Sequence, residues 1–511
     1  MNDLLLASAT HIARAIRDRA LSSSDAVEAH IAQIERVNPQ LNAVVRTRYE
    51  AAREEAARAD AVRAVTPADR LPPLHGVPCT IKECFALTGM PNASGLVSRR
   101  DVIAQRDATA VARLRAAGAI PLGVTNTSEL CLWMESNNVV YGRTNNPYDT
   151  GCIAGGSSGG EGAIVAAAGS PFGLGSDVGG SIRGPAFFNG VFGHKPTGGM
   201  VPGTGQHPIA HGDGLRYLTT GPITRRAEDL MPLLRILAGP DGLDTGCRHY
   251  ALGNPAHVQL AGRTLLDVAD NGQLAISAEL RAAQENAVRV LRDLGMKTRR
   301  VSFAGLEKQF DVWSAMMADA QHEPFASMLG EGRQRVRAGV EILKYGLGRS
   351  DHTLVASLLA LVDPLPKLMP GLTRRMVELG RKLRADIADA LGADGVLLYP
   401  SYTVVAPRHG APVRWLMRLH MPWAYCAIIN VLELPATQVP AGLNADGLPL
   451  GFQVVASHGN DHVTIAVAQQ LERALGGWVP PALAGLAAAT APEAERRRRA
   501  GSNADAPALR S

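Results

Sequence analysis

Two glycine-flanked serine motifs and one lysine are the residues of this sequence best suited to catalysis. Ser181 ends the run "SDVGGS", and Ser157 and Ser158 lie upstream in "AGGSSGGEG". Lys82 lies in the apolar stretch "VPCTIKECF". A serine hydroxyl becomes a nucleophile when a base accepts its proton, and no histidine lies close to Ser181 in the sequence. The question is therefore which serine attacks and which group accepts the proton.

The two glycines before Ser181 indicate an oxyanion hole. Because Gly179 and Gly180 have no Cβ atoms, the backbone N–H groups of residues 178–181 can converge on one point. Converging N–H groups are what a developing oxyanion requires. We therefore predict that Ser181 is a nucleophile with its own oxyanion hole. A plain glycine turn between two elements is the alternative.

Lys82 is the candidate base, and Ser157 is the candidate relay between Lys82 and Ser181. The apolar neighbours of Lys82 predict a buried strand, and a lysine is rarely buried unless it is paired or has a function. Burial favours the neutral amine of a lysine, which can accept a proton near pH 7. The alternatives are an exposed Lys82, and a "GGSSGGEG" loop that only begins a helix with serine caps.

Two other uses of glycine-rich loops fit the sequence less well. A phosphate-binding loop requires GxxxxGK[ST], and no Lys-Ser/Thr pair closes either motif. The stretch "GGSSG" matches the GxSxG nucleophile elbow with Ser157 at its centre, but such an elbow follows a buried strand. The preceding "NNPYDTGCIA" is polar and rich in turn-forming residues. The elbow is therefore the less favoured alternative.

The elements that must position these residues alternate between helices and strands. Apolar residues recur at helical spacing over 24–37, and 108–126 predicts a helix, a stop at Gly118 and an apolar strand. Further patterns predict strands over 75–85, 395–407 and 447–456 and a helix over 461–475. Because strands lie towards both ends of the chain, we expect a single α/β/α domain around one large, twisted mixed sheet.

The composition narrows the class of protein. The 511 residues are 46% hydrophobic and 19% charged, as in an ordinary globular protein. The net charge of +5 includes one run from Arg496 to Arg499, so nucleic-acid binding gains no support. The six cysteines show no zinc-site spacing, and the N-terminus lacks the features of a signal peptide. These two features predict a protein of the reducing cytoplasm. No apolar run is long enough for a transmembrane helix, so we expect none.

Three stretches together resemble the amidase signature family. They are "HGVPCTIKE" (75–83), the run from "AGGSSGGEG" to "GHKPT" (154–197) and "TGPITR" (220–225). The similarity extends over about residues 5–475 and is strongest over 75–225. This resemblance implies hydrolysis of carboxamides through an acyl-enzyme, without a metal or cofactor.

The resemblance also implies roles for individual residues. It implies a Ser–cisSer–Lys triad with Ser181 as nucleophile, Ser157 as the bridging serine in a cis peptide and Lys82 as base. The oxyanion hole that it implies consists of the backbone N–H groups of Val178, Gly179, Gly180 and Ser181. The supporting residues that it implies are Asp177 and Arg183, which would brace the loop, and Ser158.

Within the family, the sequence is more similar to fatty-acid amide hydrolases, particularly the second vertebrate type, than to the A subunit of glutamyl-tRNA amidotransferase. The stretches "ALTGMPNASGLVSRR" and "GHKPTGGMVPGTGQHPIA" carry this likeness. Glu161 stands where the amidotransferase branch usually has a small residue, which weakens the tRNA interpretation. We also expect this chain to lack the N-terminal membrane segment of the vertebrate hydrolases, which weakens the inference that it shares their membrane-lipid substrates.

These observations predict how the chain is divided. We expect residues 1–480 to form the amidase domain and 481–511 a flexible tail rich in Ala, Pro and Arg. Within the domain, 75–225 would be the Gly/Ser-rich core, and 305–425 a variable helical portion that shapes the acyl pocket. The apolar stretch 352–375 is either an entrance to that pocket or plain core.

The predicted activity is hydrolysis of linear amides with apolar acyl or aryl groups to a carboxylic acid and ammonia or an amine. The expected partner is a small-molecule amide, with no nucleic acid. A homodimer remains open, as does a weak contact of Lys367, Arg374 and Arg375 with a membrane surface. Two alternatives are an A-type glutamyl-tRNA amidotransferase subunit, which needs a partner subunit, and a non-catalytic binding protein on the same fold.

Overall fold

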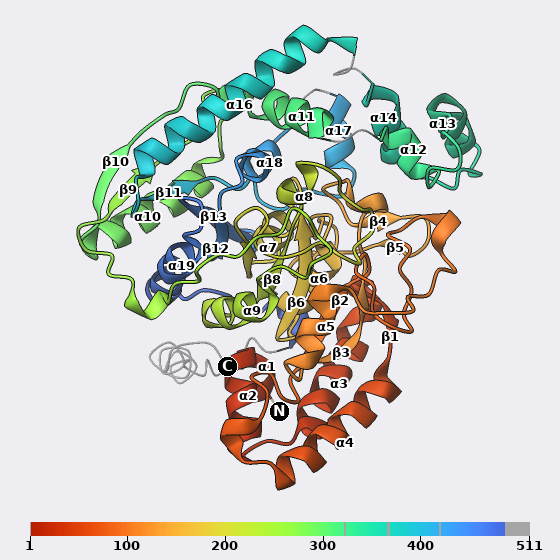
Figure 1. Ribbon diagram of the computed structural model, residues 1–511, viewed down its shortest axis with the longest axis vertical. Coiled ribbons are helices and arrows are strands. Elements are labelled where there is room, and N and C mark those ends of the chain that lie inside the picture. Colours follow the sequence, from red (N-terminus) through yellow and green to blue (C-terminus); the bar gives the residue numbers. More distant parts are fainter. Residues whose placement is uncertain (1, 321–322, 365–367, 418–420, 486–511) are drawn as a thin grey trace, which may run out of the picture.

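One large mixed sheet forms the centre of the protein (Figure 1). The computed structural model describes residues 2–320, 323–364, 368–417 and 421–485, and in these residues the sheet has eleven strands. The strands, in spatial order, are β1 (Val44–Thr47), β3 (Ile120–Thr125), β2 (Pro78–Lys82), β6 (Phe172–Asp177), β8 (Thr219–Thr224), β7 (Phe192–Lys195), β12 (Ala436–Leu443), β13 (Pro449–Ala456), β11 (Val396–Tyr399), β9 (Thr264–Asp267) and β10 (Lys297–Arg300). A separate pair consists of β4 (Asn137–Asn138) and β5 (Gly142–Arg143).

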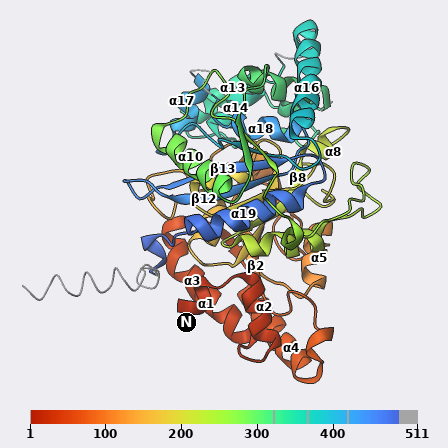
Figure 2. The same cartoon turned by 90° about the vertical axis from the view of Figure 1, so that its left-hand side faces the viewer.

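Helices flank the sheet, so the predicted α/β fold around a mixed sheet is confirmed. The helices are α1 (Asn2–Leu6), α2 (Ala9–Arg17), α3 (Ser23–Leu41), α4 (Tyr49–Val65), α5 (Thr109–Ala116), α6 (Gly159–Ala166), α7 (Arg183–Phe188), α8 (Gly214–Tyr217), α9 (Leu230–Leu237), α10 (Ala278–Asp293), α11 (Gln309–Ala320), α12 (Phe325–Leu329), α13 (Ala338–Gly346), α14 (Leu354–Val362), α16 (Pro370–Leu391), α17 (Ala411–Met417), α18 (Ala424–Val431) and α19 (Asp461–Leu475). Helices α1–α4 gather at one end of the molecule and α11–α18 at the opposite end (Figures 1 and 2). None of the helices in the described residues is long and apolar enough to cross a membrane.

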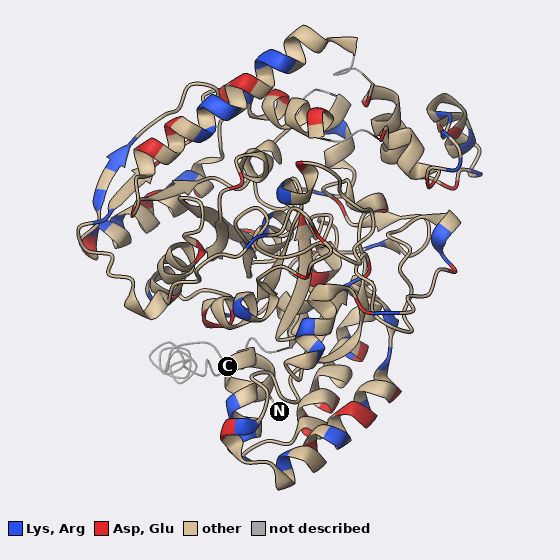
Figure 3. Cartoon of the chain, in the orientation of Figure 1, with Lys and Arg blue, Asp and Glu red and all other residues tan. Residues whose placement is uncertain are grey.

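The middle of the sheet is buried on both faces. Every residue of β2, β3, β6 and β8 is buried, and many charged residues belong to the outer helices, such as α4 and α16 (Figure 3). The edge strand β10 has the sequence "KTRR" and is mostly exposed. Charged side chains on an edge strand oppose pairing with another chain. The strands that carry the candidate residues are therefore in the most protected part of the fold.

Parallel pairing brings Lys82 and the "SDVGGS" motif to the same edge of the sheet. Strand β2 is parallel to both β3 and β6. Lys82 is the last residue of β2, and the "SDVGGS" loop continues from the last residues of β6. Because parallel strands end at the same edge, Lys82 and the loop that carries Ser181 lie side by side.

Several elements agree with the sequence predictions, and two differ. Helix α19 has the predicted bounds, and Gly118, with φ of 93°, separates α5 from β3 as expected. The predicted strand over 395–407 is only four residues long, since Pro400, which has no N–H, follows β11. Residues 481–485, which we placed in the tail, pack on α3, where Gln33 Nε2 donates to Ala484 O at 3.4 Å. The rest of the predicted tail lies outside the described residues.

Candidate active site

Lys82 lies at the centre of the candidate site. Its side chain is fully buried, which rules out an exposed Lys82. The Nζ donates hydrogen bonds to Ser157 Oγ at 2.7 Å and to Ser176 Oγ at 2.9 Å. A hydroxyl can both donate and accept, so this geometry suits transfer of a proton between Ser157 and Lys82.

Ser157 lies in a tightly packed loop before α6. The Gly156–Ser157 peptide bond is cis, as the family resemblance implied. A Cβ on Gly156 would lie 2.4 Å from the carbonyl oxygen of Trp133, so only glycine fits there. Bends and turns rather than a strand precede Ser157, so the nucleophile elbow is not formed. Ser158 occupies the N-cap position of α6, but its hydroxyl donates to Ser176 O at 3.3 Å instead of capping the helix.

Ser181 follows β6 and directly precedes Ile182, the N-cap residue of α7. The backbone carbonyl of Ser181 accepts a hydrogen bond from Ser158 N at 3.2 Å, which joins the two serine motifs. Gly180 has φ of 105°, and a Cβ there would lie 2.5 Å from Cys426 Cβ. Both the backbone conformation and the close approach therefore require glycine before Ser181.

A buried ion pair fixes the shape of the Ser181 loop. Arg183 Nε and Nη2 donate to the two carboxylate oxygens of Asp177 at 3.1 Å and 3.0 Å, and both side chains are fully buried. Arg183 also donates to Asn430 Oδ1 and to Gln453 Oε1. Burial would raise the pKa of Asp177, but the charge and hydrogen bonds of Arg183 and the amide of Ile182 hold it well below its ordinary value. Asp177 is therefore an ionised brace for the loop.

The same carboxylate changes the predicted oxyanion hole. The N–H of Gly180 donates to Asp177 Oδ1 at 2.7 Å, so this amide is already engaged by the brace. Our prediction gave this amide to the oxyanion hole, whereas here the aspartate side chain turns back onto the loop and accepts its N–H. The amides of Val178, Gly179 and Ser181 remain candidates.

Three aromatic side chains cover the loop next to Gly179. A Cβ on Gly179 would lie 3.4 Å from Trp313 Cζ2 and 3.5 Å from Trp423 Cζ3. The Trp313 and Trp423 rings pack edge to face at 4.8 Å, and Phe310 packs edge to face on Trp423 at 5.6 Å. Trp313 Nε1 donates to Val178 O at 2.9 Å. We call Trp313, Trp423 and Phe310 the aromatic wall. Nothing local in the sequence indicated it, because α11 and the start of α18 are far from Gly179 in the chain.

Two polar residues next to Lys82 were also not predicted as parts of the site. Ser176 lies inside the "SDVGGS" motif and could have been found there. Glu161, which we noted only as a departure from amidotransferases, accepts hydrogen bonds from Thr80 Oγ1 at 2.6 Å and Thr125 Oγ1 at 2.9 Å. Burial raises the pKa of Glu161 to about 8, against the opposing effects of these hydroxyls and of the charge of Lys82. The carboxyl group is therefore mostly protonated at pH 7.

Two of the histidines near the motifs, His75 and His194, are held in structural contacts. His194 is buried between Asp461 and Thr437, at 3.1 Å and 2.9 Å. His75 Nε2 lies 2.9 Å from the carbonyl oxygen of Ala59. Burial and the charge of Arg99 lower the pKa of His207 to about 4. Among the hydrogen bonds of the described residues, no histidine ring bonds to Lys82, Ser157 or Ser181.

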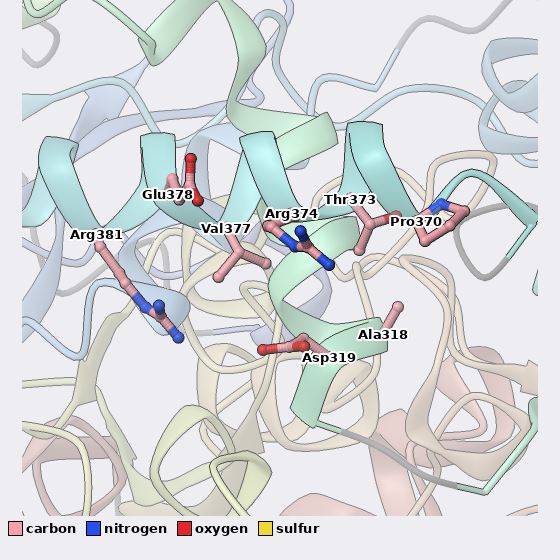
Figure 4. Close-up of a pocket in the computed structure, with 8 residues that line it drawn as sticks. All are labelled: Ala318, Asp319, Pro370, Thr373, Arg374, Val377, Glu378 and Arg381. Carbon is pink, nitrogen blue, oxygen red and sulfur yellow. The ribbon is translucent and has the colours of Figure 1, made fainter.

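A hollow lined by residues of α11 and α16 is separate from the serine cluster. Its volume is about 550 Å³. Figure 4 shows its lining, with Arg374 and Val377 of α16 on one side and Asp319 of α11 on the other. None of its lining residues belongs to the cluster of Lys82 and the serines. In the described part of the chain, no group of three or more His, Cys, Asp or Glu residues could hold a metal ion.

Comparison with known proteins decides the family. The amidase family model matches residues 25–465. The chain belongs to the amidase family. It is 45% identical over 492 residues to "Fatty-acid amide hydrolase 2" of Homo sapiens, an alignment that covers 94% of this chain and 91% of that protein. It is 32% identical over 485 residues to "Acylamidase" of Rhodococcus erythropolis, covering 91% of this chain and 94% of that protein.

A solved structure extends the comparison to the fold. The structure of "6-aminohexanoate cyclic dimer hydrolase complexed with substrate" superimposes with a TM-score of 0.77 at 28% identity, and covers 94% of this chain and 99% of that one. The predicted resemblance to fatty-acid amide hydrolases of the second vertebrate type is confirmed. The chain is therefore an amide-hydrolysing enzyme, and the comparisons do not favour the amidotransferase subunit or the non-catalytic binding protein.

Proposed function

We propose that this enzyme hydrolyses linear carboxamides with apolar acyl or aryl groups, through an acyl-enzyme on Ser181. One observation carries the proposal: buried Lys82 hydrogen-bonds to Ser157, and the Ser157 loop is bonded to the backbone of Ser181. This arrangement supports a relay from Ser181 through Ser157 to Lys82.

In the proposed reaction, Ser181 Oγ attacks the amide carbonyl carbon while its proton passes to Ser157 Oγ. Ser157 gives its own proton to Lys82 Nζ, so the lysine holds one additional proton. The C–N bond then breaks, and the leaving amine receives a proton back through Ser157. Water next attacks the acyl-enzyme by the same relay, which releases the carboxylic acid and restores Ser181.

The amides of Val178, Gly179 and Ser181 would stabilise the negative charge on the tetrahedral intermediate. The ion pair of Asp177 and Arg183 supports this role for the three amides, because its buried hydrogen bonds fix the conformation of the loop. A loop fixed before the reaction needs no reorganisation when the charge develops.

An apolar acyl group is the substrate that fits the aromatic wall. Trp313 and Trp423 lie against Gly179, in the proposed oxyanion hole, so the group attached to the reacting carbonyl would meet their rings. Both residues come from 305–425, the portion that we predicted to shape the acyl pocket. Flat rings favour linear chains and aryl groups over bulky polar ones.

The wider setting of the enzyme is also proposed. All six cysteines are free and buried, which supports a reducing compartment such as the cytoplasm. Large apolar side chains are exposed near α13, α14 and α16, namely Leu343, Leu347, Leu361, Leu368, Met369 and Leu372. Arg374 and Arg375 lie beside them, which supports a weak contact with a membrane surface, whereas Lys367 lies outside the described residues. A homodimer stays a prediction.

A panel of primary amides of graded chain length tests the proposal. We expect released ammonia to increase with the length of the acyl chain until the pocket is full, and a fluorophosphonate to label Ser181. A protein that releases ammonia from none of these amides and is not labelled would contradict the proposal.

A further inference from the structure

Two cysteines that the proposed reaction does not use lie against the Lys82 cluster. Cys84 follows β2 two residues after Lys82, and its Sγ lies 3.7 Å from Ser176 Oγ. Cys131 ends the short 3-10 turn Glu129–Cys131. Its thiol lies next to the Cys84 thiol and the Ser157 hydroxyl. The two thiols are therefore neighbours, and each contacts a hydroxyl that is hydrogen-bonded to Lys82.

The backbone of His207 connects the two cysteines. Its N–H donates to the carbonyl oxygen of Cys84 at 2.9 Å, and its own carbonyl oxygen lies 4.0 Å from Cys131 Sγ. Cys131 Sγ also lies 3.3 Å from Thr127 Oγ1. Both cysteines belong to the same buried cluster of side chains. Contacts on several sides thus hold the two sulfur atoms in one place.

The surroundings make Cys131 the more reactive of the two. Burial opposes ionisation of its thiol, but the hydrogen bond from Cys84 and the charge of Lys82, when that lysine is protonated, lower the pKa of Cys131 below its ordinary value. Burial keeps the pKa of Cys84 well above the ordinary value. Cys131 is 6% exposed and Cys84 is fully buried. An oxidant would therefore reach Cys131 first, with Cys84 beside it as the resolving thiol.

We propose that Cys84 and Cys131 form an oxidation site at which hydrogen peroxide switches the enzyme off. The Cys131 thiolate attacks one peroxide oxygen, the O–O bond breaks, and the departing hydroxide takes up the proton that Cys131 had lost. Cys131 is then a sulfenic acid. The Cys84 sulfur attacks it, the S–O bond breaks, and the second hydroxide leaves as water with the Cys84 proton. Two electrons pass to the peroxide, and a Cys84–Cys131 disulfide remains.

The disulfide would disturb the proposed relay. Its sulfur atoms are about 2.05 Å apart, so both cysteines must move from their present contact. Cys84 is close to Lys82 in the chain, and Cys131 contacts Ser157, so the movement displaces the Lys82–Ser157 pair. The loss of activity rests on the proposed function, whereas formation of the disulfide does not.

Treatment of the purified enzyme with hydrogen peroxide tests this site through two separate readouts. Mass spectrometry should find peptides joined through Cys84 and Cys131 and lacking two hydrogen atoms. The kcat/KM for a primary amide should fall about a hundredfold, since a misplacement of about 1 Å can cost that much, and dithiothreitol should restore it. Lost activity without this disulfide would overturn the site, and a disulfide without lost activity would overturn the switch. Untreated enzyme that hydrolyses no amide would contradict the proposed function alone, because the mass readout still decides the site.

Three variants, each compared with its own untreated activity, sharpen the test. Cys131→Ser should resist peroxide. Cys84→Ser should stop at the sulfenic acid of Cys131, which dimedone traps. Cys247→Ser is the matched control, because Cys247 is 9% exposed and its contacts do not involve Lys82 or the serines; it should remain as sensitive as the wild type. Peroxide sensitivity that persists in Cys131→Ser, or that disappears in Cys247→Ser, would overturn the proposal.

Discussion

The serine–lysine cluster and the helical region at 305–425 differ in how much freedom their packing leaves. In the cluster, polar side chains are buried and hydrogen-bonded, and a Cβ on Gly156 or Gly180 would collide with its neighbours. In the helical region, Leu361 is 56% exposed and Leu368 73% exposed. In a tightly packed site, a substitution displaces the groups that perform the reaction. In a loosely covered region, side chains can be replaced without displacing those groups. We therefore expect substitutions of the proposed triad to lower the rate on every amide, and substitutions in the helical region to change only substrate preference.

Removal of the nucleophile should have the largest effect. We expect Ser181→Ala to lower kcat by about 10⁴-fold or more and to abolish labelling by a fluorophosphonate, because no other group would form the acyl-enzyme. Ser157→Ala should slow turnover while labelling persists at a reduced rate. The labelled residue is identified by mass spectrometry. Label on Ser157 or Ser158 would contradict the assignment of Ser181 as the nucleophile.

Removal of the proposed base, Lys82, should have the second-largest effect on the rate. Lys82 is the only base proposed for the relay, so we expect Lys82→Ala to lower kcat/KM by about 10²- to 10⁴-fold. The measurement is the steady-state rate of both proteins on one primary amide. Single replacement of His75, His194 and His207 serves as the control, and a loss of more than about tenfold in any of them at unchanged melting temperature would point to a histidine base.

Gly179 and Gly180 provide a matched pair of variants that tests how tightly the Ser181 loop is packed. Gly180→Ala places a Cβ 2.5 Å from Cys426 Cβ at a φ of 105°, so we expect a loss of about 2–3 kcal/mol in the free energy of unfolding. Gly179→Ala meets the rings of Trp313 and Trp423 at ordinary contact distance and should be much milder. Chemical denaturation measures both. Equal losses in the two variants would show that the loop is less tightly packed than its contacts indicate.

The parts of the site that could be predicted from the sequence are those that depend on short segments of chain. Glycines two and one residues before Ser181 shape a loop through their own backbone, so their effect is visible in the sequence. An apolar stretch around a lysine indicates a buried strand, and β2 is that strand. The hydrogen bond between Gly180 N and Asp177 depends on the conformation of one side chain, which no pattern reports.

The parts that could not be predicted depend on distant segments. Trp313 and Trp423 reach Gly179 only because α11 and α18 pack together over the end of the sheet. The stretch 352–375 was predicted as either an entrance or core, and the structure divides it. Ala356 and Ala360 of α14 pack on the α12 side chains, whereas Leu361 is exposed. Helical periodicity gave the width of the apolar face but not which part of it is covered.

Apolar side chains on α14 allow a test of the smallest expected effect, a change in how kcat/KM depends on the length of the acyl chain. Leu358 is half-buried and Leu361 is exposed, so neither is a core residue. If they line an entrance for the acyl chain, each buried methylene of the substrate adds about 0.8 kcal/mol, and two more carbons raise kcat/KM by about tenfold until the pocket is full. The double variant Leu358→Ser, Leu361→Ser should flatten this dependence on chain length and spare acetamide.

A matched double variant separates an entrance from a general loss of apolar surface. Leu343 and Leu347 are both 72% exposed and belong to α13 and the residue that ends it, so Leu343→Ser, Leu347→Ser removes similar surface from a neighbouring helix. This control should keep the full dependence on chain length, measured as released ammonia over the amide panel, and both variants should keep the wild-type melting temperature. If the α14 variant instead loses activity on every amide in step with its melting temperature, α14 is part of the core. If both variants flatten the dependence equally, long substrates reach the site by way of the whole apolar surface, and substrate preference is spread over the helical region rather than set at α14.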